Sequence, residues 1–157
     1  MNGVGMLVSC FLLSIVSALV PWVNGEVMVL SFSALAPSPV HLAGLALLAS
    51  AGQMIGKCIL YWTGRGALSM KKGRVAQALN SWKGRLERSS KKTMGLVFLS
   101  AIFGIPPFYI ISILSGAVGL RFSQFIAIGA CGRLLHFGVL ILIPQFGIRL
   151  YHIIVNH

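Results

Sequence analysis

Glu26, Lys57 and Arg133 are ionisable side chains inside long apolar stretches of this 157-residue chain, which has only two acidic residues. A charged group at membrane depth is costly unless it is paired or hydrated. We predict that Glu26 is a protonatable or cation-coupling carboxylate. The alternative is that it caps a helix N-terminus, where the helix dipole favours an anion. Arg133 is suited either to binding a phosphate with its fork of donors or to neutralising Glu26.

The other ionisable residues of the apolar segments also have two interpretations each. We expect Lys57 to reach the membrane surface with its long side chain, and a substrate contact is the alternative. Arg65 is expected to mark the cytoplasmic boundary, or else to steer phosphate headgroups. His136 is expected to be a hydrogen-bonded interior residue rather than a proton relay.

The sequence offers little material for catalysis or metal binding. It has no paired carboxylates, no Ser/His/Asp set, no glycine-rich phosphate loop and no metal-ligand spacing. Cys10, Cys58 and Cys131 are isolated in apolar runs, where we expect small buried side chains. We therefore expect a protein that is not an enzyme and that holds no metal or other cofactor.

The composition indicates the environment in which these residues lie. Hydrophobic residues make up 57% of the chain and charged residues 10%, with a mean hydropathy of +0.89. A soluble domain carries about 25% charged residues, so a soluble globular enzyme, a disordered tail and a secreted disulfide module are excluded. We predict an all-α integral membrane protein that forms a single membrane domain over residues 1–157.

Two proline-broken apolar stretches predict helices that cannot all cross a membrane. In residues 1–39 a first run ends at Pro21 and the next has only ten residues, whereas a spanning helix needs about 20. We predict a re-entrant helical hairpin with Glu26 near its tip, although residues 4–20 are just long enough to span alone. Residues 93–121 repeat this pattern. The predicted hairpin breaks lie at Pro21, Gly25, Gly104, Pro106 and Pro107.

A long apolar helix is expected after each hairpin, over residues 40–64 and 122–144. Pro144 is expected to end the second helix and to leave a tail over residues 145–157. Because one spanning helix separates the two hairpins, they should enter the membrane from opposite faces. That arrangement is an inverted repeat, which is common among secondary transporters.

The central segment, residues 65–92, differs from its apolar neighbours. Val75, Leu79, Trp82 and Leu86 recur at helical spacing and predict an amphipathic helix on an anionic membrane surface. The excess of positive charge predicts that this loop is cytoplasmic, and its confinement to one loop argues against nucleic-acid binding. The basic residues expected at the membrane surface are Lys71, Lys72, Arg74, Lys83, Arg85, Arg88, Lys91 and Lys92.

Several short motifs follow one another along the chain in a distinctive order. They are Pro21-x-x-x-Gly25-Glu26, Gly52-x-x-x-Gly56-Lys57-x-x-x-Tyr61-x-x-Gly64-Arg65, Pro106-Pro107, Ser115-Gly116-Ala117, Phe125, Gly129 and Gly132-Arg133. Taken together, their order and spacing resemble the DedA family, also called the VTT-domain or SNARE-associated Golgi protein superfamily. The likeness covers about residues 18–140 and is closest to the short bacterial branch.

The resemblance implies two opposed re-entrant hairpins in a transporter or scramblase-like protein. Such a protein moves phospholipid or undecaprenyl phosphate across the bacterial cytoplasmic membrane. Glu26 matches the acidic residue of the family's first hairpin, which implies proton or cation coupling. The chain departs from the family at Lys57, where an aspartate is frequent. It also lacks the arginines that usually flank the second hairpin's proline, where Phe103, Phe108 and Tyr109 stand instead.

Two other functions stay open on the sequence alone. A membrane scaffold would bind anionic lipid or a partner through the basic loop without transporting anything. A carrier of ions or small solutes would share the inverted repeat. The expected partners are membrane lipids, mainly anionic ones, and the small-residue helix surfaces are compatible with a homo-oligomer.

Overall fold

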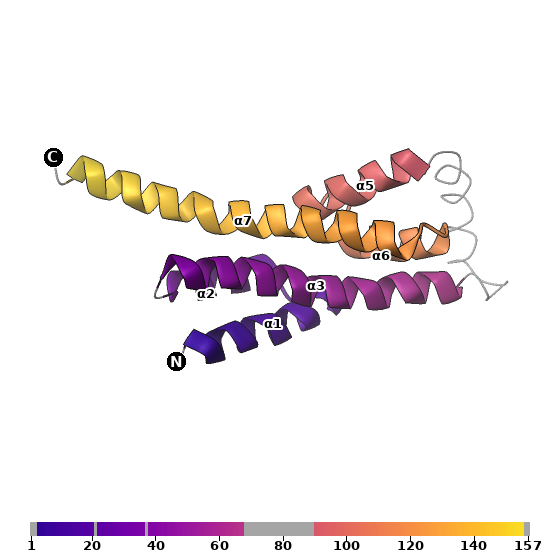
Figure 1. Cartoon of the computed structure of the whole chain (residues 1–157), viewed down its shortest axis with the longest axis horizontal. Helices are drawn as coiled ribbons and strands as arrows, with labels where there is room; N and C mark the ends of the chain where they lie inside the picture. Colours follow the sequence, from indigo (N-terminus) through magenta and orange to yellow (C-terminus); the bar gives the residue numbers. More distant parts are fainter. Residues whose placement is uncertain (1–2, 21, 37, 68–89, 156–157) are drawn as a thin grey trace.

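The computed structural model describes residues 3–20, 22–36, 38–67 and 90–155 (Figure 1). Within these ranges every regular element is a helix, which confirms the all-α prediction for them. The helices are α1 (Gly3–Leu19), α2 (Gly25–Ala34), α3 (Pro39–Ala67), α5 (Ser90–Phe103), α6 (Phe108–Ala117) and α7 (Phe122–Val155).

The long helices α3 and α7 form the centre of the bundle. Each contains an apolar segment, Pro39–Gly66 and Phe122–Pro144, that is long enough to cross a membrane, since about 20 residues suffice for the hydrocarbon core. The two helices lie side by side and run in opposite directions (Figure 1). Helices α1 and α6 pack on α3, and α5 packs on α7.

The shorter helices of the described ranges form two pairs, α1–α2 and α5–α6, each interrupted by a short non-helical break. Helices α2 and α6 have ten residues each, which at 1.5 Å per residue covers about half of a hydrocarbon core. The start of α1 and the end of α2 lie at the left end of Figure 1, whereas the start of α5 and the end of α6 lie at the right end. The two pairs therefore turn back inside the bundle from opposite ends.

Glycines on the long helices let the short helices approach closely. A Cβ atom at Gly56 of α3 would lie 2.5 Å from the Cβ atom of Ala18 in α1, and one at Gly132 of α7 would lie 2.6 Å from that of Ala101 in α5. These glycines therefore serve helix packing. Gly104, with a φ of +70°, adopts the left-handed conformation just after α5 and ends that helix.

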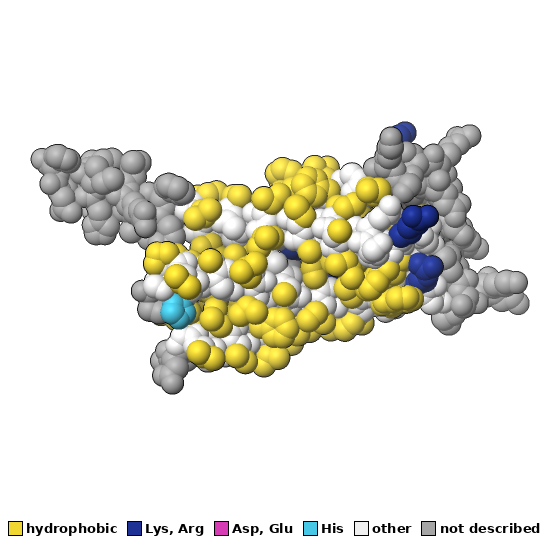
Figure 2. All heavy atoms as spheres, in the orientation of Figure 1, with side chains coloured by type: hydrophobic (Ala, Val, Ile, Leu, Met, Phe, Trp, Pro, Cys, Tyr) yellow, Lys and Arg dark blue, Asp and Glu magenta, His cyan; other side chains and the backbone are white. Residues whose placement is uncertain are grey.

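The lateral surface of the bundle is apolar, as expected of a membrane protein. Large hydrophobic side chains are exposed along α1 and α7, including Leu12, Val16, Val139 and Leu142. Figure 2 shows that the described lysine and arginine side chains on this face gather mainly at the end where α3 ends and α7 begins. A soluble monomer rarely exposes such a continuous apolar surface.

Two predicted boundaries are wrong. Pro144 does not end the last helix, because α7 contains this proline and continues to Val155, so residues 145–155 are not a separate tail. Proline disfavours a helix interior, but the loss of one hydrogen bond can be outweighed by the turns on either side. Helix α3 also continues beyond residue 64, to Ala67.

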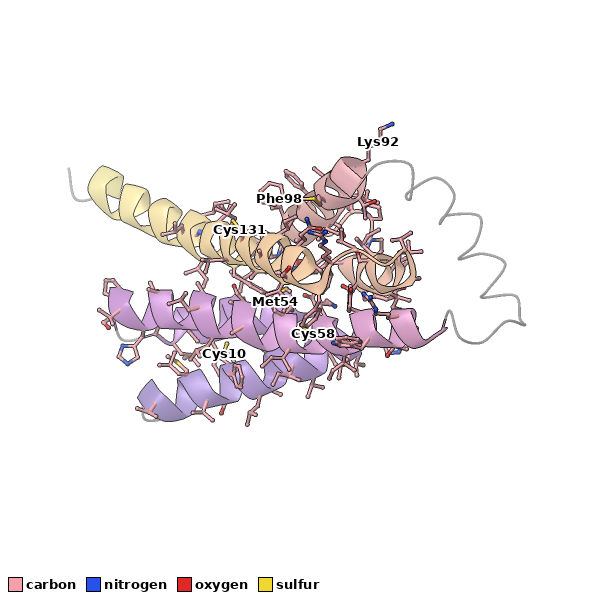
Figure 3. The ribbon with its side chains drawn as sticks, turned by 45° about the vertical axis from the view of Figure 1, so that its right-hand side comes forward. Cys10, Met54, Cys58, Lys92, Phe98 and Cys131 are labelled. Carbon is pink, nitrogen blue, oxygen red and sulfur yellow. The ribbon has the colours of Figure 1, made fainter. Side chains whose placement is uncertain are left out.

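Most of the basic segment lies outside the described residues. This holds for the predicted amphipathic helix and for Lys71, Lys72, Arg74, Lys83, Arg85 and Arg88, and for the side chain of Lys91. Lys92 is exposed on α5 and points away from the bundle in Figure 3.

The three cysteines are free and lie apart on α1, α3 and α7 (Figure 3). Cys10 is buried, as expected for a small apolar side chain. Cys131 is exposed and Cys58 is partly exposed, so the prediction that all three are buried is wrong. An apolar sequence context does not separate the buried face of a membrane helix from the face that contacts lipid.

Candidate functional site

Both helix breaks line one cavity of about 420 Å³. Its wall includes Glu26, Lys57 and Arg133, three of the four residues predicted to bind substrate or to couple transport. The fold thus brings three charged side chains from three helices to one place. The remaining lining residues come from α1, α3, the two breaks and the first turns of α2 and α6: Ser17, Ala18, Trp22, Val23, Asn24, Gly25, Gln53, Gly104, Pro107, Phe108 and Tyr109.

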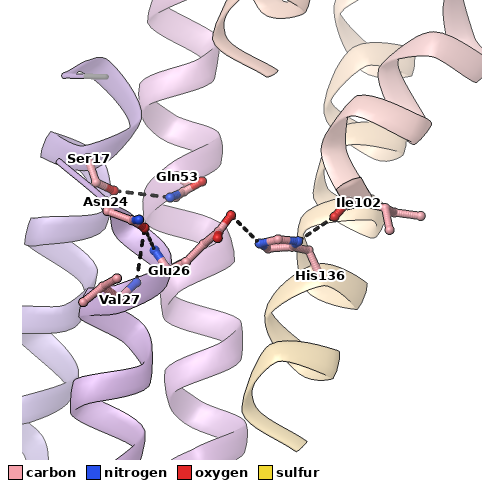
Figure 4. A network of polar contacts seen from close by, with 7 residues as sticks. All are labelled: Ser17, Asn24, Glu26, Val27, Gln53, Ile102 and His136. Carbon is pink, nitrogen blue, oxygen red and sulfur yellow. Dashed lines mark hydrogen bonds and ion pairs between the residues drawn. The ribbon is translucent and has the colours of Figure 1, made fainter. Parts of the chain in front are cut away.

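Glu26 lies in the first turn of α2, and its side chain is half exposed. Asn24 caps this helix, because its side-chain oxygen accepts hydrogen bonds from the backbone N–H groups of Glu26 at 3.0 Å and Val27 at 3.2 Å (Figure 4). The helix dipole favours an anion in the first turn. Since Asn24 supplies the cap, the Glu26 carboxylate is left to face the cavity and His136.

His136 of α7 connects the first break to the second. Its Nε2 atom lies 3.2 Å from Oε1 of Glu26, and its Nδ1 atom donates a hydrogen bond of 2.5 Å to the carbonyl oxygen of Ile102 in α5 (Figure 4). The expected hydrogen-bonded interior position is confirmed. Sequence reasoning missed the contact with Glu26. The available indication was that His136 follows Arg133 by three residues, which places both on one face of α7.

Lys57 is buried in the bundle, so the prediction that it lies at the membrane surface is wrong. The residue is 5% exposed, and its ammonium group donates a hydrogen bond of 2.7 Å to the carbonyl oxygen of Ala18. Ala18 is in the last turn of α1, where carbonyl groups lack partners within the helix. Lys57 therefore hydrogen-bonds to a carbonyl group in the last turn of α1, as His136 does to one in the last turn of α5.

Arg133 is 7% exposed, and its guanidinium carbon lies 5.0 Å from the centre of the Phe108 ring. Its buried Nε atom has no hydrogen-bond partner among the described residues. A buried donor without an acceptor is costly, so an acceptor from a ligand would be stabilised there. In the described part of the chain, the charged or ionisable side chain within 4 Å of the Glu26 carboxylate is His136 rather than Arg133.

Arg65 belongs to a separate cluster near the end of α3. Its Nη1 atom donates a hydrogen bond of 2.8 Å to the Tyr61 hydroxyl, and its guanidinium carbon lies 5.9 Å from the centre of the Trp62 ring. The Tyr61 hydroxyl in turn donates to the carbonyl oxygen of Leu120, just before α7. Arg65 thus helps to hold α3 against the connection between α6 and α7, and the structure does not bring it to the cavity.

The predicted hairpin breaks contribute mainly backbone to the site. Gly25, Gly104 and Pro107 line the cavity, whereas Pro21 lies outside the described residues. Pro106 contributes differently: its carbonyl oxygen accepts a hydrogen bond of 2.5 Å from the Ser100 hydroxyl. That bond ties the second break to the last turn of α5.

The two helices that begin at the cavity differ in how their first turns are capped. Asn24 caps α2, whereas α6 follows Pro107 without a side-chain hydrogen bond at its cap. A helix N-terminus presents free N–H groups and a partial positive charge, and so favours anions. Together with Arg133 and Lys57, the start of α6 makes the cavity electropositive at the second break.

This arrangement can hold an anionic group. Two cationic side chains face the cavity against the single carboxylate of Glu26. The guanidinium fork of Arg133 and an uncapped helix N-terminus both match the oxygens of a phosphate. Within the described ranges, no group of three or more His, Cys, Asp or Glu side chains could hold a metal ion.

Comparison with known proteins gives one family match. The family model described as VTT domain matches residues 20–146, which is most of the chain. This range includes both helix breaks and every charged side chain of the cavity. No curated protein and no solved structure matches the chain.

Proposed function

The chain belongs to the VTT-domain family of DedA and SNARE-associated proteins, and from this premise we propose that it moves a lipid or lipid phosphate across the bacterial cytoplasmic membrane. Family membership and the two long apolar helices together indicate a membrane protein. The proposed substrates are phospholipids or undecaprenyl phosphate, which share a phosphate group attached to long apolar chains.

The observation that carries this proposal is an electropositive cavity between two helix breaks in an otherwise apolar bundle. A lipid has the same two parts, because its anionic headgroup matches the cavity and its apolar chains match the surface of the bundle. The headgroup phosphate would accept hydrogen bonds from Arg133 and from the first turn of α6, while Lys57 adds positive charge. The chains would stay in the membrane against the exposed hydrophobic side chains.

In the proposed mechanism the two helix pairs re-enter the membrane from opposite faces as an inverted repeat. The opposed directions of the pairs in the bundle support this arrangement (Figure 1). The ten-residue lengths of α2 and α6 support it as well, because about 20 residues are needed to span. The headgroup would then cross between the breaks, where backbone groups and charged side chains replace water.

Glu26 supplies the coupling step of this mechanism. When its carboxylate is ionised, it offsets one of the two cationic charges of the cavity. When it is protonated, both cations are available to the headgroup. Protonation would therefore favour headgroup binding and bias which side of the membrane the cavity opens to.

The basic segment has a separate part in the proposal. Residues 65–92 would lie on the cytoplasmic face and bind anionic lipids of that leaflet, as their concentration of lysine and arginine supports. The protein would act without enzymatic chemistry, since two acids in the whole chain leave little material for general acid–base catalysis.

Reconstitution into liposomes tests the proposal. A fluorescent phosphatidylglycerol reports flux when a membrane-impermeant reductant bleaches the outer leaflet of phosphatidylglycerol–phosphatidylethanolamine vesicles. We expect Glu26→Gln and Arg133→Ala to lower the wild-type rate at least about tenfold, which corresponds to about 1.4 kcal/mol. Arg121→Ala is the matched control, because Arg121 is exposed and does not line the cavity.

Two results would contradict the proposal. Wild-type flux from both cavity variants would remove the mechanism. Absence of wild-type flux for the fluorescent phosphatidylglycerol and for a fluorescent polyprenyl phosphate tested in parallel would remove lipid transport itself. A response to only one of these probes would identify the lipid class.

A further inference from the structure

We infer that His136 is a positioning residue that ties the two helix breaks together through a contact with Glu26 that depends on one proton. Its part in transport rests on the proposed function. The bridge itself follows from the contacts of three groups, the Glu26 carboxylate, the His136 ring and the Ile102 carbonyl (Figure 4).

These contacts require at least one proton on the His136 ring. The carbonyl oxygen of Ile102 can only accept a hydrogen bond, so the Nδ1 atom 2.5 Å away must carry a proton. The Nε2 atom, 3.2 Å from Oε1 of Glu26, then has two favourable states. Either Nε2 also carries a proton and faces a carboxylate, or Nε2 is unprotonated and Glu26 is a carboxylic acid. In both states the pair of side chains holds one proton in addition to the Nδ1 proton.

Loss of that proton would break the contact. The lone pair of Nε2 would then face an ionised carboxylate, and two acceptors repel each other. Nε2 is buried and makes no aligned hydrogen bond to any residue that the structure describes, so no other group there would compensate. The bridge is therefore present while the pair holds the proton and is lost when the proton is released.

Other ionisable groups face the pair from the neighbouring helices. Arg133 lies one turn before His136 on α7, Lys57 reaches the same cavity from α3, and Tyr109 lines it from α6. Arg133 and Lys57 line the same cavity as Glu26, but neither cation forms an ion pair with Glu26 in the described ranges. Among the side chains that the structure describes, α1 and α5 contribute uncharged groups to this environment, Ser17 and Ala18 in the first case and the Ile102 backbone in the second.

The bridge joins the two halves of the chain. Glu26 is the second residue of α2, at the first break, and Ile102 is in the last turn of α5, at the second break. Helix α7, which carries His136, packs against both α2 and α5. By contrast, the hydrogen bond from Lys57 to Ala18 stays within the first half. A single side chain thus contacts both breaks, and we expect release of its proton to widen the cavity between them.

Distances between spin labels test the bridge without depending on transport. The labels are attached at Trp22→Cys and Ile105→Cys, one on each break, where both side chains are strongly exposed. Cys10, Cys58 and Cys131 are replaced by alanine, and the protein is held in nanodiscs of phosphatidylglycerol and phosphatidylethanolamine. We expect a narrow, short distance distribution at acidic pH and a longer, broader one at alkaline pH.

Two substitutions should fix the bridge in opposite states. His136→Phe keeps an aromatic ring but removes both nitrogen atoms, so the distances should be long at either pH. Glu26→Gln places an uncharged amide opposite Nε2, and this amide can donate to an unprotonated ring, so the distances should stay short at either pH. His41→Phe is the control, because His41 contacts Ser38 at the start of α3 and not the cavity.

The inference is overturned if His136→Phe matches the wild type at both pH values, or if the pH response persists in Glu26→Gln. Lipid flux through the same proteins separates this inference from the proposed function. Distances that change as expected in a protein without flux would overturn the function and keep the bridge. Flux in a protein whose distances ignore His136 and pH would keep the function and overturn the bridge.

Discussion

At the scale of single residues, the cavity shows why broken helices in an apolar bundle need buried hydrogen-bond donors. Each break leaves carbonyl groups at a helix end without hydrogen-bond partners within the helix. The hydrocarbon region of a membrane has no water to donate hydrogen bonds to them. Lys57 and His136 bond to such carbonyl groups at Ala18 and Ile102. Arg133 has no such bond at its Nε atom in the part of the chain that the structure describes. It is therefore the cation best placed to serve a ligand.

The role of Lys57 gives a prediction about stability. Lys57→Met should lower the free energy of unfolding by about 1–3 kcal/mol, because the buried carbonyl of Ala18 loses its donor. Lys92→Met, at an exposed position, should change it by less than about 0.5 kcal/mol. Thermal unfolding in detergent, followed by circular dichroism, measures both. Equal stability of the two variants would show that α1 does not need Lys57.

The sequence identified the charged residues of the site but not their partners. Glu26, Lys57 and Arg133 stood out because charges are rare in apolar runs. Their contacts depend on packing: Lys57 bonds to a residue 39 positions away, and no local pattern specifies that pairing. The surface position expected for Lys57 was wrong because its long side chain can reach a buried carbonyl as readily as a headgroup.

At the scale of helices, the positions of proline and glycine correctly predicted the two helix breaks but wrongly predicted the end of α7. The interruptions before α2 and α6 coincide with proline and glycine clusters and with short apolar runs. Pro144 is also a proline after an apolar run, yet α7 continues through it. A proline that is flanked by strong helical turns on both sides costs less than ending the helix, and sequence pattern alone does not weigh these terms.

Close packing of α6 on α3 gives a prediction at this scale. A Cβ atom at Gly116 would overlap the backbone carbonyl oxygen of Tyr61, which cannot rotate away. Gly116→Ala should therefore push the helices apart and destabilise the protein by about 1–3 kcal/mol. Gly138 of α7 has no atom within 4 Å of its would-be Cβ, so Gly138→Ala should be neutral or stabilising by up to about 1 kcal/mol.

Melting temperatures of the two glycine variants, measured in one detergent, make the comparison direct. Both substitutions add the same methyl group to a helix, so intrinsic helix propensity cancels between them. A Gly116→Ala protein that melts at or above the temperature of Gly138→Ala would show that α3 and α6 are not in close contact.

At the scale of the whole molecule, topology explains why the breaks meet. Among the described residues, one long helix, α3, lies between the two helix pairs, and the pairs approach the centre from opposite ends of the bundle (Figure 1). The number and length of the apolar runs made this order of elements predictable. The cavity was not predictable, because it depends on where α1 packs against Gly56 of α3 and where α5 packs against Gly132 of α7.

Accessibility of single cysteines in cells tests most directly whether both helix pairs turn back inside the membrane. Val4→Cys, Ser38→Cys, Lys92→Cys and Arg121→Cys are made in a protein without other cysteines and exposed to a membrane-impermeant maleimide. We expect labelling of the Val4 and Ser38 positions from outside the cell, and labelling of the Lys92 and Arg121 positions only after the cytoplasmic face is opened. Labelling of the Val4 and Ser38 positions from opposite faces would contradict it.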